Sequence, residues 1–270
     1  MTTAIINGIE MYYERHGDEG EPLVLVHGYT GDVGDWSHQI PEFSRTHRVL
    51  VMDHRGHGRS EAPSDHGAYT IKEMTRDIMG LVEHAGFERY HLVGHSMGGA
   101  VAQEIALHSP GRLMSLTLED TGPGFDMHKN PAVANYIERR FKVAREQGMA
   151  AVAEMPGMPD PPHMPPGRRE YEKKRMSQMS IDGLIGAWQA LTGWEGTRDR
   201  VHQIEISTLV IYGVLDAGIA DSMKFLGAKI PGAVVHEVPE AAHCPQFERP
   251  EIFNAAVRTH LERNAGRAGK

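Results

Sequence analysis

The sequence predicts an α/β protein in which a mostly parallel sheet carries helices on both faces and a helical cap is inserted into it. Leu23–Val26 and Val49–Met52 are continuous apolar runs of the kind that strands buried on both faces require. Stretches with apolar residues at helical spacing alternate with such runs, which is typical of parallel strands joined by crossover helices. A long stretch without this alternation then interrupts the second half of the chain, and this interruption predicts the cap.

The elements before the centre of the chain are expected to begin with an edge hairpin. Ile5–Glu14 alternates around Asn7-Gly8, a dipeptide that favours a type I′ turn. A helix is expected from about Asp35 to Phe43, between the two apolar runs. Thr70 is expected to be the N-cap of the next helix, with Glu73 completing a capping box.

The remaining elements of the sheet continue the same alternation on either side of the interruption. They are expected to be strands at Tyr90–Val93, Leu113–Leu118, Thr208–Gly213 and Val234–Val238, and helices at Ala100–Leu107, Ala220–Ile230 and Pro250–Arg263.

We expect a core domain of residues 1–120 and 206–270 and a cap of residues 121–205. The alternative is a second independent domain, but the proline-rich middle of this stretch makes a separate core less favourable. Met158 and Pro159 belong to that middle, which is rich in both residue types. The helices expected in the cap are Pro131–Gln147, Arg168–Ser180 and Ile181–Leu191.

Composition and charge exclude several classes of function. The formal net charge of the 270 residues is −8, and no basic stripe offers a nucleic-acid surface. No apolar run approaches the length of a membrane span, and the first residues lack the pattern of a signal peptide. The single cysteine, Cys244, fits a reducing compartment. We therefore expect a cytoplasmic protein that binds a small molecule. The sequence leaves open whether the protein forms a homo-oligomer.

Gly94-His95-Ser96-Met97-Gly98 is the motif around which the chain is organised. A strand precedes this Gly-x-Ser-x-Gly segment and a helix follows it, an arrangement that presents the serine on a strained turn at the carboxyl edge of the sheet. The two glycines are needed because strand and helix cross closely there. Ser96 is therefore the expected nucleophile, at a helix N-terminus that can stabilise a developing anion.

A serine hydroxyl needs a base, and a histidine oriented by a carboxylate is the usual partner. After such a turn the expected chain order is serine, acid, histidine. His243 lies in the loop after the last strand and is the expected base. Asp216 follows the preceding strand and is the expected acid, whereas Asp120, with Glu119 at the end of the strand after the turn, is the alternative.

The tetrahedral intermediate requires two N–H donors for its oxyanion. The backbone N–H of Met97 follows the nucleophile and is one candidate, and the N–H of Tyr29, after the Leu23–Val26 strand, is the other. His27 is then expected to brace this loop rather than take part in the reaction.

Other interpretations of polar clusters are weaker. Asp53, His54 and His57 have a spacing that suggests a metal, but three potential ligands so close in sequence, without an outside partner, are a weak signal. The same stretch lacks the third glycine of a dinucleotide fingerprint. Cys244 is expected to be a packed thiol, since no second base accompanies it. No cofactor or metal is therefore expected.

Five motifs occur along the chain in this order: His27-Gly28-Tyr29, Asp53-x-Arg55-Gly56-x-Gly58-x-Ser60, Gly94–Gly99, Gly213-x-x-Asp216 and Ala242-His243. With these motifs the chain resembles the α/β-hydrolase superfamily, and most of all its small bacterial esterases, enol-lactonases and cofactor-free perhydrolases. The residue before the base histidine is Ala242, where the family usually has glycine. The carbon–carbon bond hydrolases of the superfamily commonly carry asparagine where this chain has His95.

The resemblance implies an α/β-hydrolase fold and a serine hydrolase of carboxylic esters or lactones. Two alternatives remain open: a carbon–carbon bond hydrolase of the same fold, and a ligand-binding signalling protein that retains the triad. The cap is expected to supply an apolar pocket, with Phe125, Trp188 and Trp194 among its lining residues, beside Met97.

Overall fold

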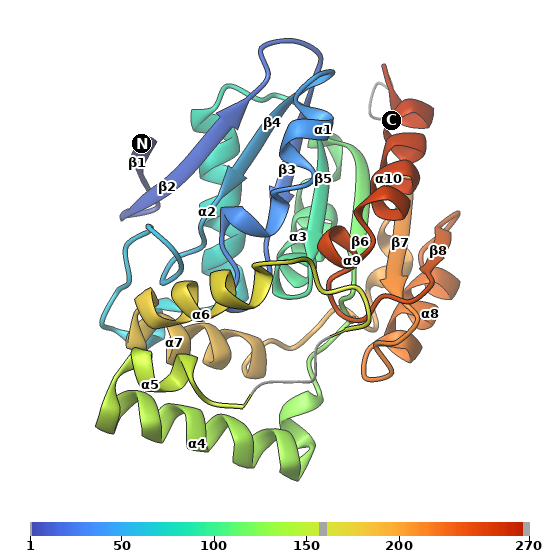
Figure 1. Ribbon diagram of the computed structural model, residues 1–270. Helices are drawn as coiled ribbons and strands as arrows, with labels where there is room; N and C mark the ends of the chain where they lie inside the picture. Colours follow the sequence, from blue (N-terminus) through green and yellow to red (C-terminus); the bar gives the residue numbers. More distant parts are fainter. Residues whose placement is uncertain (1, 157–160, 267–270) are drawn as a thin grey trace.

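The apolar runs form the centre of a single sheet. In this computed structural model, which describes residues 2–156 and 161–266, the eight described strands follow the order β1-β2-β4-β3-β5-β6-β7-β8 (Figure 1). From β4 to β8 neighbouring strands are parallel, whereas β2 pairs antiparallel with both β1 and β4. The bounds are β1 Thr2–Ile6, β2 Ile9–His16, β3 Glu21–Val26, β4 His47–Met52, β5 Tyr90–His95, β6 Leu113–Glu119, β7 Thr208–Gly213 and β8 Val234–Val238.

The edge hairpin forms as predicted. Asn7 and Gly8 both have positive φ, 49° and 81°, which is the backbone conformation of a type I′ turn between β1 and β2. Such a turn matches the right-handed twist of the strands that it joins.

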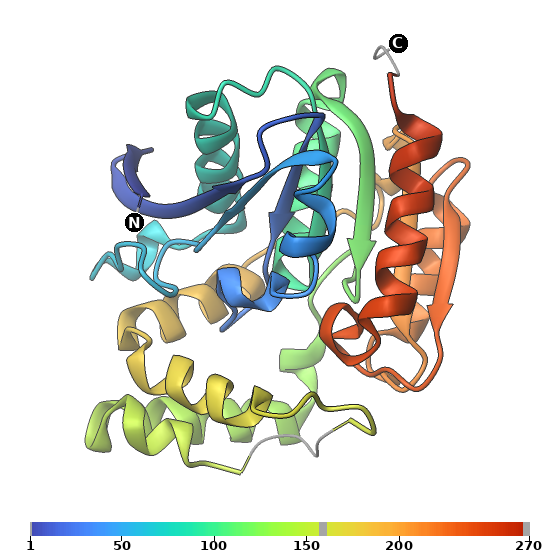
Figure 2. The same ribbon diagram turned by 45° about the horizontal axis from the view of Figure 1, so that its top comes forward.

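Helices cover both faces of the sheet, as the alternation predicts (Figure 2). One face packs against α2 (Ile71–His84), α3 (Met97–His108) and α8 (Ala220–Lys229). The other face packs against α1 (Ile40–Phe43) and α10 (Pro250–Asn264), with Trp36 and Phe253 fully buried between helix and sheet. None of the helices in the described part of the chain combines the length and apolar character that a membrane span requires.

Two local predictions need correction. The single helix expected from Asp35 to Phe43 is instead a 3₁₀ turn, η1 (Val33–Trp36), followed by the short α1. Pro41 lacks the N–H that a continuous helix would need there. Thr70 is the N-cap of α2 and accepts from the Glu73 N–H at 3.0 Å, but the Glu73 carboxylate bonds to other side chains, so the capping box is only half formed.

Over its described residues, the stretch between β6 and β7 contributes four α-helices, α4 (Pro131–Gln147), α5 (Met149–Ala153), α6 (Arg168–Gln178) and α7 (Ile181–Thr192). Both ribbon views place them together beyond the carboxyl ends of the parallel strands. They share a small apolar cluster that includes Met149, Met179 and Leu184. Met158 and Pro159 lie outside the described residues. The cap bounds of 121–205 remain a prediction.

The register of the sheet brings distant loops to one edge. Gly94 of β5 pairs with Val26 of β3, and Glu119 of β6 pairs with Ile211 of β7. The loops that follow these parallel strands therefore leave the sheet side by side. These are the loops that carry the polar residues selected from the sequence.

Candidate active site

Ser96 stands on a strained turn between β5 and α3. Its backbone angles are φ 52° and ψ −112°, a combination that costs a non-glycine residue energy and persists only where neighbouring contacts enforce it. Two hydrogen bonds do so: the Ser96 N–H donates to the Glu119 carbonyl at 2.9 Å, and the Thr121 hydroxyl donates to the Ser96 carbonyl at 2.8 Å. The geometry is that of a nucleophile elbow.

The glycines around Ser96 allow the backbones to approach one another. A Cβ on Gly94 would lie 2.4 Å from the Gly98 carbonyl oxygen, and a Cβ on Gly98 would lie 2.3 Å from the Val26 carbonyl oxygen. Gly28 faces the serine directly, since a Cβ there would lie 3.0 Å from the Ser96 Cβ. Larger side chains at these positions would displace the turn that presents Ser96.

His243 bridges Ser96 and Asp216. Its Nε2 lies 3.0 Å from the Ser96 Oγ, and its Nδ1 lies 2.5 Å from the Asp216 Oδ2. The Leu215 N–H donates to the Ala241 carbonyl at 2.9 Å, so the loops that carry the acid and the histidine are bonded to each other. A serine, an imidazole and a carboxylate in this order can pass a proton from the hydroxyl to the ring.

The alternative carboxylate, Asp120, lies behind this trio. It is fully buried, and its two oxygens accept only long bonds from the Gly213 N–H, at 3.3 and 3.4 Å. Burial, with smaller contributions from Glu119 and Asp216, raises the pKa of Asp120 well above its ordinary value. A carboxyl group in that state is a poor partner for an imidazolium.

The two backbone N–H groups expected as oxyanion donors have no hydrogen-bond acceptor in the described part of the chain. Within residues 2–156 and 161–266, the N–H groups of Tyr29 and Met97 donate to no acceptor. Met97 is the first residue of α3, where the orphan N–H groups and the helix dipole favour a negative charge. Free N–H donors are what an oxyanion hole requires.

Two buried histidines brace the loop of Tyr29. His57 Nδ1 donates to the Arg55 carbonyl, and its Nε2 accepts the Thr30 N–H at 3.2 Å, where Thr30 has a positive φ of 61°. His27 Nε2 accepts the His54 N–H at 3.0 Å, and its Nδ1 bonds to the Gly28 carbonyl. Burial lowers the pKa of His27 to about 3 and that of His57 to about 4, so both rings are neutral and each keeps one nitrogen as acceptor. The sequence pointed to His27 as a brace but not to His57.

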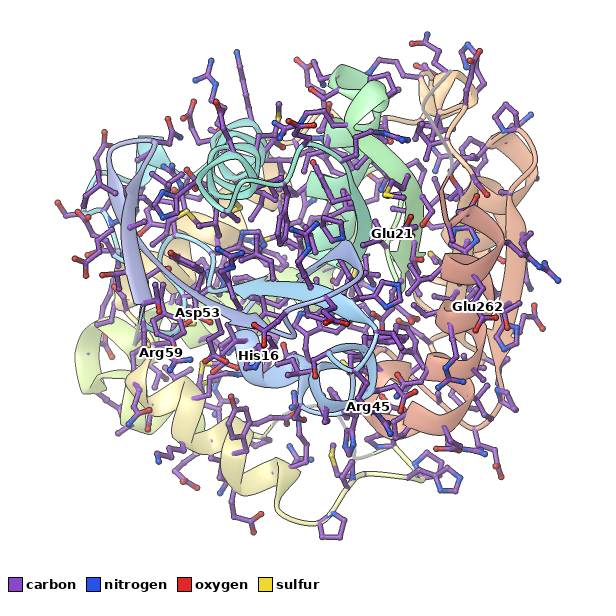
Figure 3. The ribbon with its side chains drawn as sticks, turned by 90° about the horizontal axis from the view of Figure 1, so that it is seen from above. His16, Glu21, Arg45, Asp53, Arg59 and Glu262 are labelled. Carbon is purple, nitrogen blue, oxygen red and sulfur yellow. The ribbon has the colours of Figure 1, made fainter. Side chains whose placement is uncertain are left out.

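The stretch considered as a metal site has other partners. Asp53 is buried and accepts the N–H groups of Val33, at 2.8 Å, and Arg59, at 2.9 Å. Figure 3 labels Asp53 and Arg59 in the same region of the molecule. Among the described residues, the potential ligand atoms of Asp120, Asp216 and His243 lie within 4.8 Å of one another. Asp216 and His243 already bond to each other beside Ser96, and Asp120 is their buried neighbour.

Cys244, next to His243, lies 3.9 Å from the His95 Nε2. Burial raises the pKa of the Cys244 thiol well above its ordinary value, which is the property of a packed thiol rather than of a nucleophile.

Two of the three aromatic residues expected in the pocket meet near the Tyr29 loop. The Trp188 ring lies 5.7 Å from the Tyr29 ring and 5.1 Å from the Phe125 ring, measured between centroids. Trp194 lies elsewhere, and its indole N–H donates to the Glu104 carboxylate at 2.8 Å. The Trp194 side chain borders a groove of about 650 Å³ between α2, α3 and α7. The pairing of Trp194 with the buried Glu104 explains why it does not join the other two rings.

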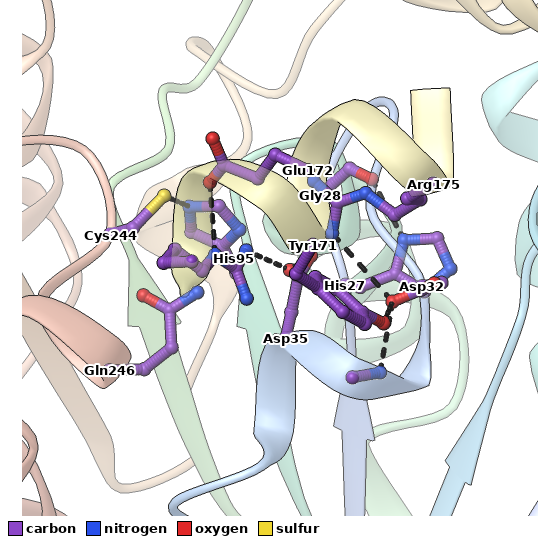
Figure 4. Close-up of polar contacts among 12 residues, drawn as sticks. His27, Gly28, Asp32, Asp35, His95, Tyr171, Glu172, Arg175, Cys244 and Gln246 are labelled. Carbon is purple, nitrogen blue, oxygen red and sulfur yellow. Dashed lines mark hydrogen bonds and ion pairs between the residues drawn. The ribbon is translucent and has the colours of Figure 1, made fainter. Parts of the chain in front are cut away.

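An ion cluster joins α6 to the 3₁₀ turn after the Tyr29 loop, and the sequence analysis missed it (Figure 4). Asp35 is 4% exposed, and its Oδ1 accepts from Arg168 at 2.5 Å and from Arg175 at 2.6 Å. Tyr171 donates to Asp32 in the same cluster at 2.6 Å. Burial alone would raise the pKa of Asp35, but the two guanidinium groups outweigh burial and hold it well below its ordinary value. Local patterns carry no signal for this cluster because its members lie more than 130 residues apart.

Comparison with known proteins gives matches along the chain. A family model described as alpha/beta hydrolase fold matches residues 21–154. RutD, a candidate carbamate hydrolase of Azorhizobium caulinodans, is 30% identical over 91% of this chain and 92% of its own length.

Two solved structures are similar over almost their whole length. The enol-lactonase of Burkholderia xenovorans superimposes with a TM-score of 0.84 at 26% identity, covering 97% of this chain and 100% of the enzyme. A thermophilic esterase of Thermogutta terrifontis superimposes with a TM-score of 0.85 at 29% identity, covering 98% of this chain and 100% of the esterase.

Proposed function

Since the chain belongs to the α/β-hydrolase family, we propose that it cleaves carboxylic esters or lactones through an acyl-enzyme formed on Ser96. The observation that carries this proposal is the unbroken contact from the Ser96 Oγ through the His243 imidazole to the Asp216 carboxylate. The esterase and the enol-lactonase among its structural neighbours support the same class of substrate.

His243 acts first as a base. Its Nε2 takes the proton of the Ser96 hydroxyl while the oxygen attacks the substrate carbonyl carbon. The carbonyl oxygen becomes an oxyanion, and the N–H groups of Tyr29 and Met97 stabilise it. Asp216 holds the Nδ1 proton and stabilises the imidazolium that forms.

His243 then acts as an acid and protonates the leaving alkoxide, which departs as the alcohol. In the second half of the reaction, a water molecule gives a proton to His243 and attacks the acyl carbon. Collapse of the second intermediate returns the proton to Ser96 and releases the carboxylic acid. In a lactone the alcohol and the acid belong to one product molecule.

Asp216 is assigned as the acid because it touches the imidazole directly. Asp120 makes only long bonds to backbone, and its raised pKa favours the protonated form. The acid is therefore assigned by its contact with the His243 ring and not by its position in the sequence.

We assign the substrate pocket to the space beneath the cap, beside Tyr29, Phe125 and Trp188. The ring contacts between them support an apolar wall close to the proposed oxyanion donors. Trp194 is left out of this pocket, since its indole lies against Glu104.

Wild type and Ser96→Ala, assayed on p-nitrophenyl esters of increasing acyl length and on several lactones, test the proposal. Parallel samples are treated with a fluorophosphonate, which labels an activated serine. We expect label and turnover to disappear together in the variant, with kcat lower on the order of 10⁶-fold. Turnover within tenfold of wild type in Ser96→Ala would overturn the assignment. Labelling of wild type without multiple turnover would favour the ligand-binding alternative.

A further inference from the structure

Glu248 holds the backbone on both sides of His243. It is the last residue of α9 (Pro245–Glu248), the short helix that follows the histidine loop. Its Oε2 accepts the N–H of Ala242 at 2.5 Å, and its Oε1 accepts the N–H of Cys244 at 3.0 Å. The residues immediately before and after the histidine are therefore bonded to one carboxylate.

A third contact holds the histidine's own carbonyl group. The His95 Nε2 lies 2.8 Å from the His243 carbonyl oxygen, and burial lowers the pKa of His95 to about 3. Since a carbonyl oxygen only accepts, the neutral His95 ring donates its Nε2 proton to it. The peptide groups around His243 are thus held by Glu248 on one side and by His95 on the other.

The hydrogen bonds of Glu248 favour the ionised form of its carboxyl group. Each of its two oxygens accepts a backbone N–H group, and N–H donors aimed at a carboxyl group favour its charged form. Burial raises the pKa of Glu248, and the two N–H donors oppose that rise. The residue is 5% exposed, and no ion pair joins it to an arginine or lysine in the described part of the chain. His243 is then the cationic group that its charge can stabilise.

Resting on the proposed function above, we propose that Glu248 is a positioning residue for the base: its carboxylate fixes the His243 backbone so that the imidazole spans Ser96 and Asp216, and its charge stabilises the imidazolium.

Other charged and titratable groups face the same loop and contribute to its electrostatics. Asp216 bonds to the imidazole, and Asp120 lies behind it with a raised pKa. These groups remain unchanged when Glu248 alone is substituted. The further members of the set are Glu119 at the end of β6, His95 at the end of β5, Cys244 in the loop itself, Asp35 of η1 and Arg168 of α6.

Glu248→Gln tests the proposal because it keeps the shape of the side chain and removes its charge. One of the two backbone N–H groups then faces the amide NH₂, so the loop loses a bond as well. We expect kcat to fall about tenfold to a hundredfold, as for a small displacement of a reacting group, with KM within about twofold. Loss of the nearby negative charge should also move the acid limb of the pH–rate profile down by about one pH unit.

Glu262→Gln is the matched control. Glu262 lies exposed on α10, and its side chain makes no ion pair within residues 2–156 and 161–266. The control makes the same chemical change and the same change in net charge. We expect its kcat and its pH–rate profile to equal those of wild type.

Glu248→Asp separates the two roles. The shorter carboxylate keeps the charge but cannot reach both N–H groups, so the acid limb should stay at the wild-type pH while kcat falls. A kcat within twofold of wild type in Glu248→Gln, with an unmoved acid limb, would overturn the proposal. The proposal would also be overturned if kcat fell equally in Glu248→Gln and Glu248→Asp and the acid limb of the pH–rate profile moved in neither variant. A purely structural role predicts that result.

A readout without substrate keeps this test independent of the proposed reaction. The titration midpoint of the His243 imidazole is followed by NMR, using the resonance that His243→Gln removes. We expect the midpoint to fall in Glu248→Gln and to stay in Glu262→Gln. An unchanged midpoint, or a Glu248→Gln protein that is folded and fully active, contradicts the role of Glu248. Failure of wild type to react with the fluorophosphonate would instead contradict the role of Ser96.

Discussion

Replacing Asp35 with asparagine should destabilise the protein by about 3 kcal/mol. The change removes a buried charge that accepts from two guanidinium groups, and breaking a buried ion pair in this way costs about 3–5 kcal/mol. Two remaining pairs reduce the loss: Arg168 keeps Glu172 at 2.9 Å, and Arg175 keeps Asp32 at 3.7 Å. The lower end of the range therefore applies. For a chain of this length, about 3 kcal/mol corresponds to a fall in Tm of about 5 °C.

The assay is urea unfolding of wild type, Asp35→Asn and Asp18→Asn, followed by circular dichroism. Asp18 is exposed and has no ion pair in the part of the chain that the structure describes, so its variant should match wild type within about 0.5 kcal/mol. If Asp35→Asn is no less stable than Asp18→Asn, the ion cluster between α6 and η1 does not stabilise the fold, and the reasoning fails.

The pH dependence of the same difference gives a second check. The folded-state pKa of Asp35 lies below its unfolded value. The ionised carboxylate therefore adds its full contribution to the free energy of unfolding above the unfolded pKa, about 3.9. The contribution is lost as the pH falls through the folded-state pKa. We expect a constant stability difference between wild type and Asp35→Asn from pH 8 to about pH 5, and a smaller one below about pH 4.

Three further predictions concern the reaction. Asp216→Asn should lower kcat by about 10⁴-fold and Asp120→Asn by less than tenfold, measured on one p-nitrophenyl ester; the reverse ranking would assign the acid to Asp120. Gly28→Ala places a Cβ 3.0 Å from the Ser96 Cβ, so kcat should fall about a hundredfold while KM stays unchanged. Wild-type kinetics in this variant would show that the loop can shift to accommodate the methyl group. Trp188→Ala should raise KM for the preferred ester about tenfold, whereas Trp194→Ala should lower Tm and leave KM unchanged. Equal KM values in the two variants would show that Trp188 does not line the pocket.

The sheet could be predicted because its information is local. Leu23–Val26 and Val49–Met52 are apolar throughout, and they lie in the central strands β3 and β4. The turn at Ser96 is equally local, since two glycines and a small-residue helix suffice to predict the strand-turn-helix conformation. The expected helix at Asp35–Phe43 was wrong for a local reason too, because Pro41 has no N–H to donate within a continuous helix.

The sequence alone determined which residue types stand at the ends of parallel strands, since periodicity and glycine spacing act over a few residues. It therefore placed Ser96, Asp216 and His243 on neighbouring loops. Only the tertiary structure decided which carboxylate touches the imidazole, how Trp188 and Trp194 separate, and how Glu248 and Asp35 are used. These outcomes depend on distances between segments far apart in the chain and on burial, which shifts the pKa of each carboxyl group. Local sequence patterns predict neither the distances nor the burial.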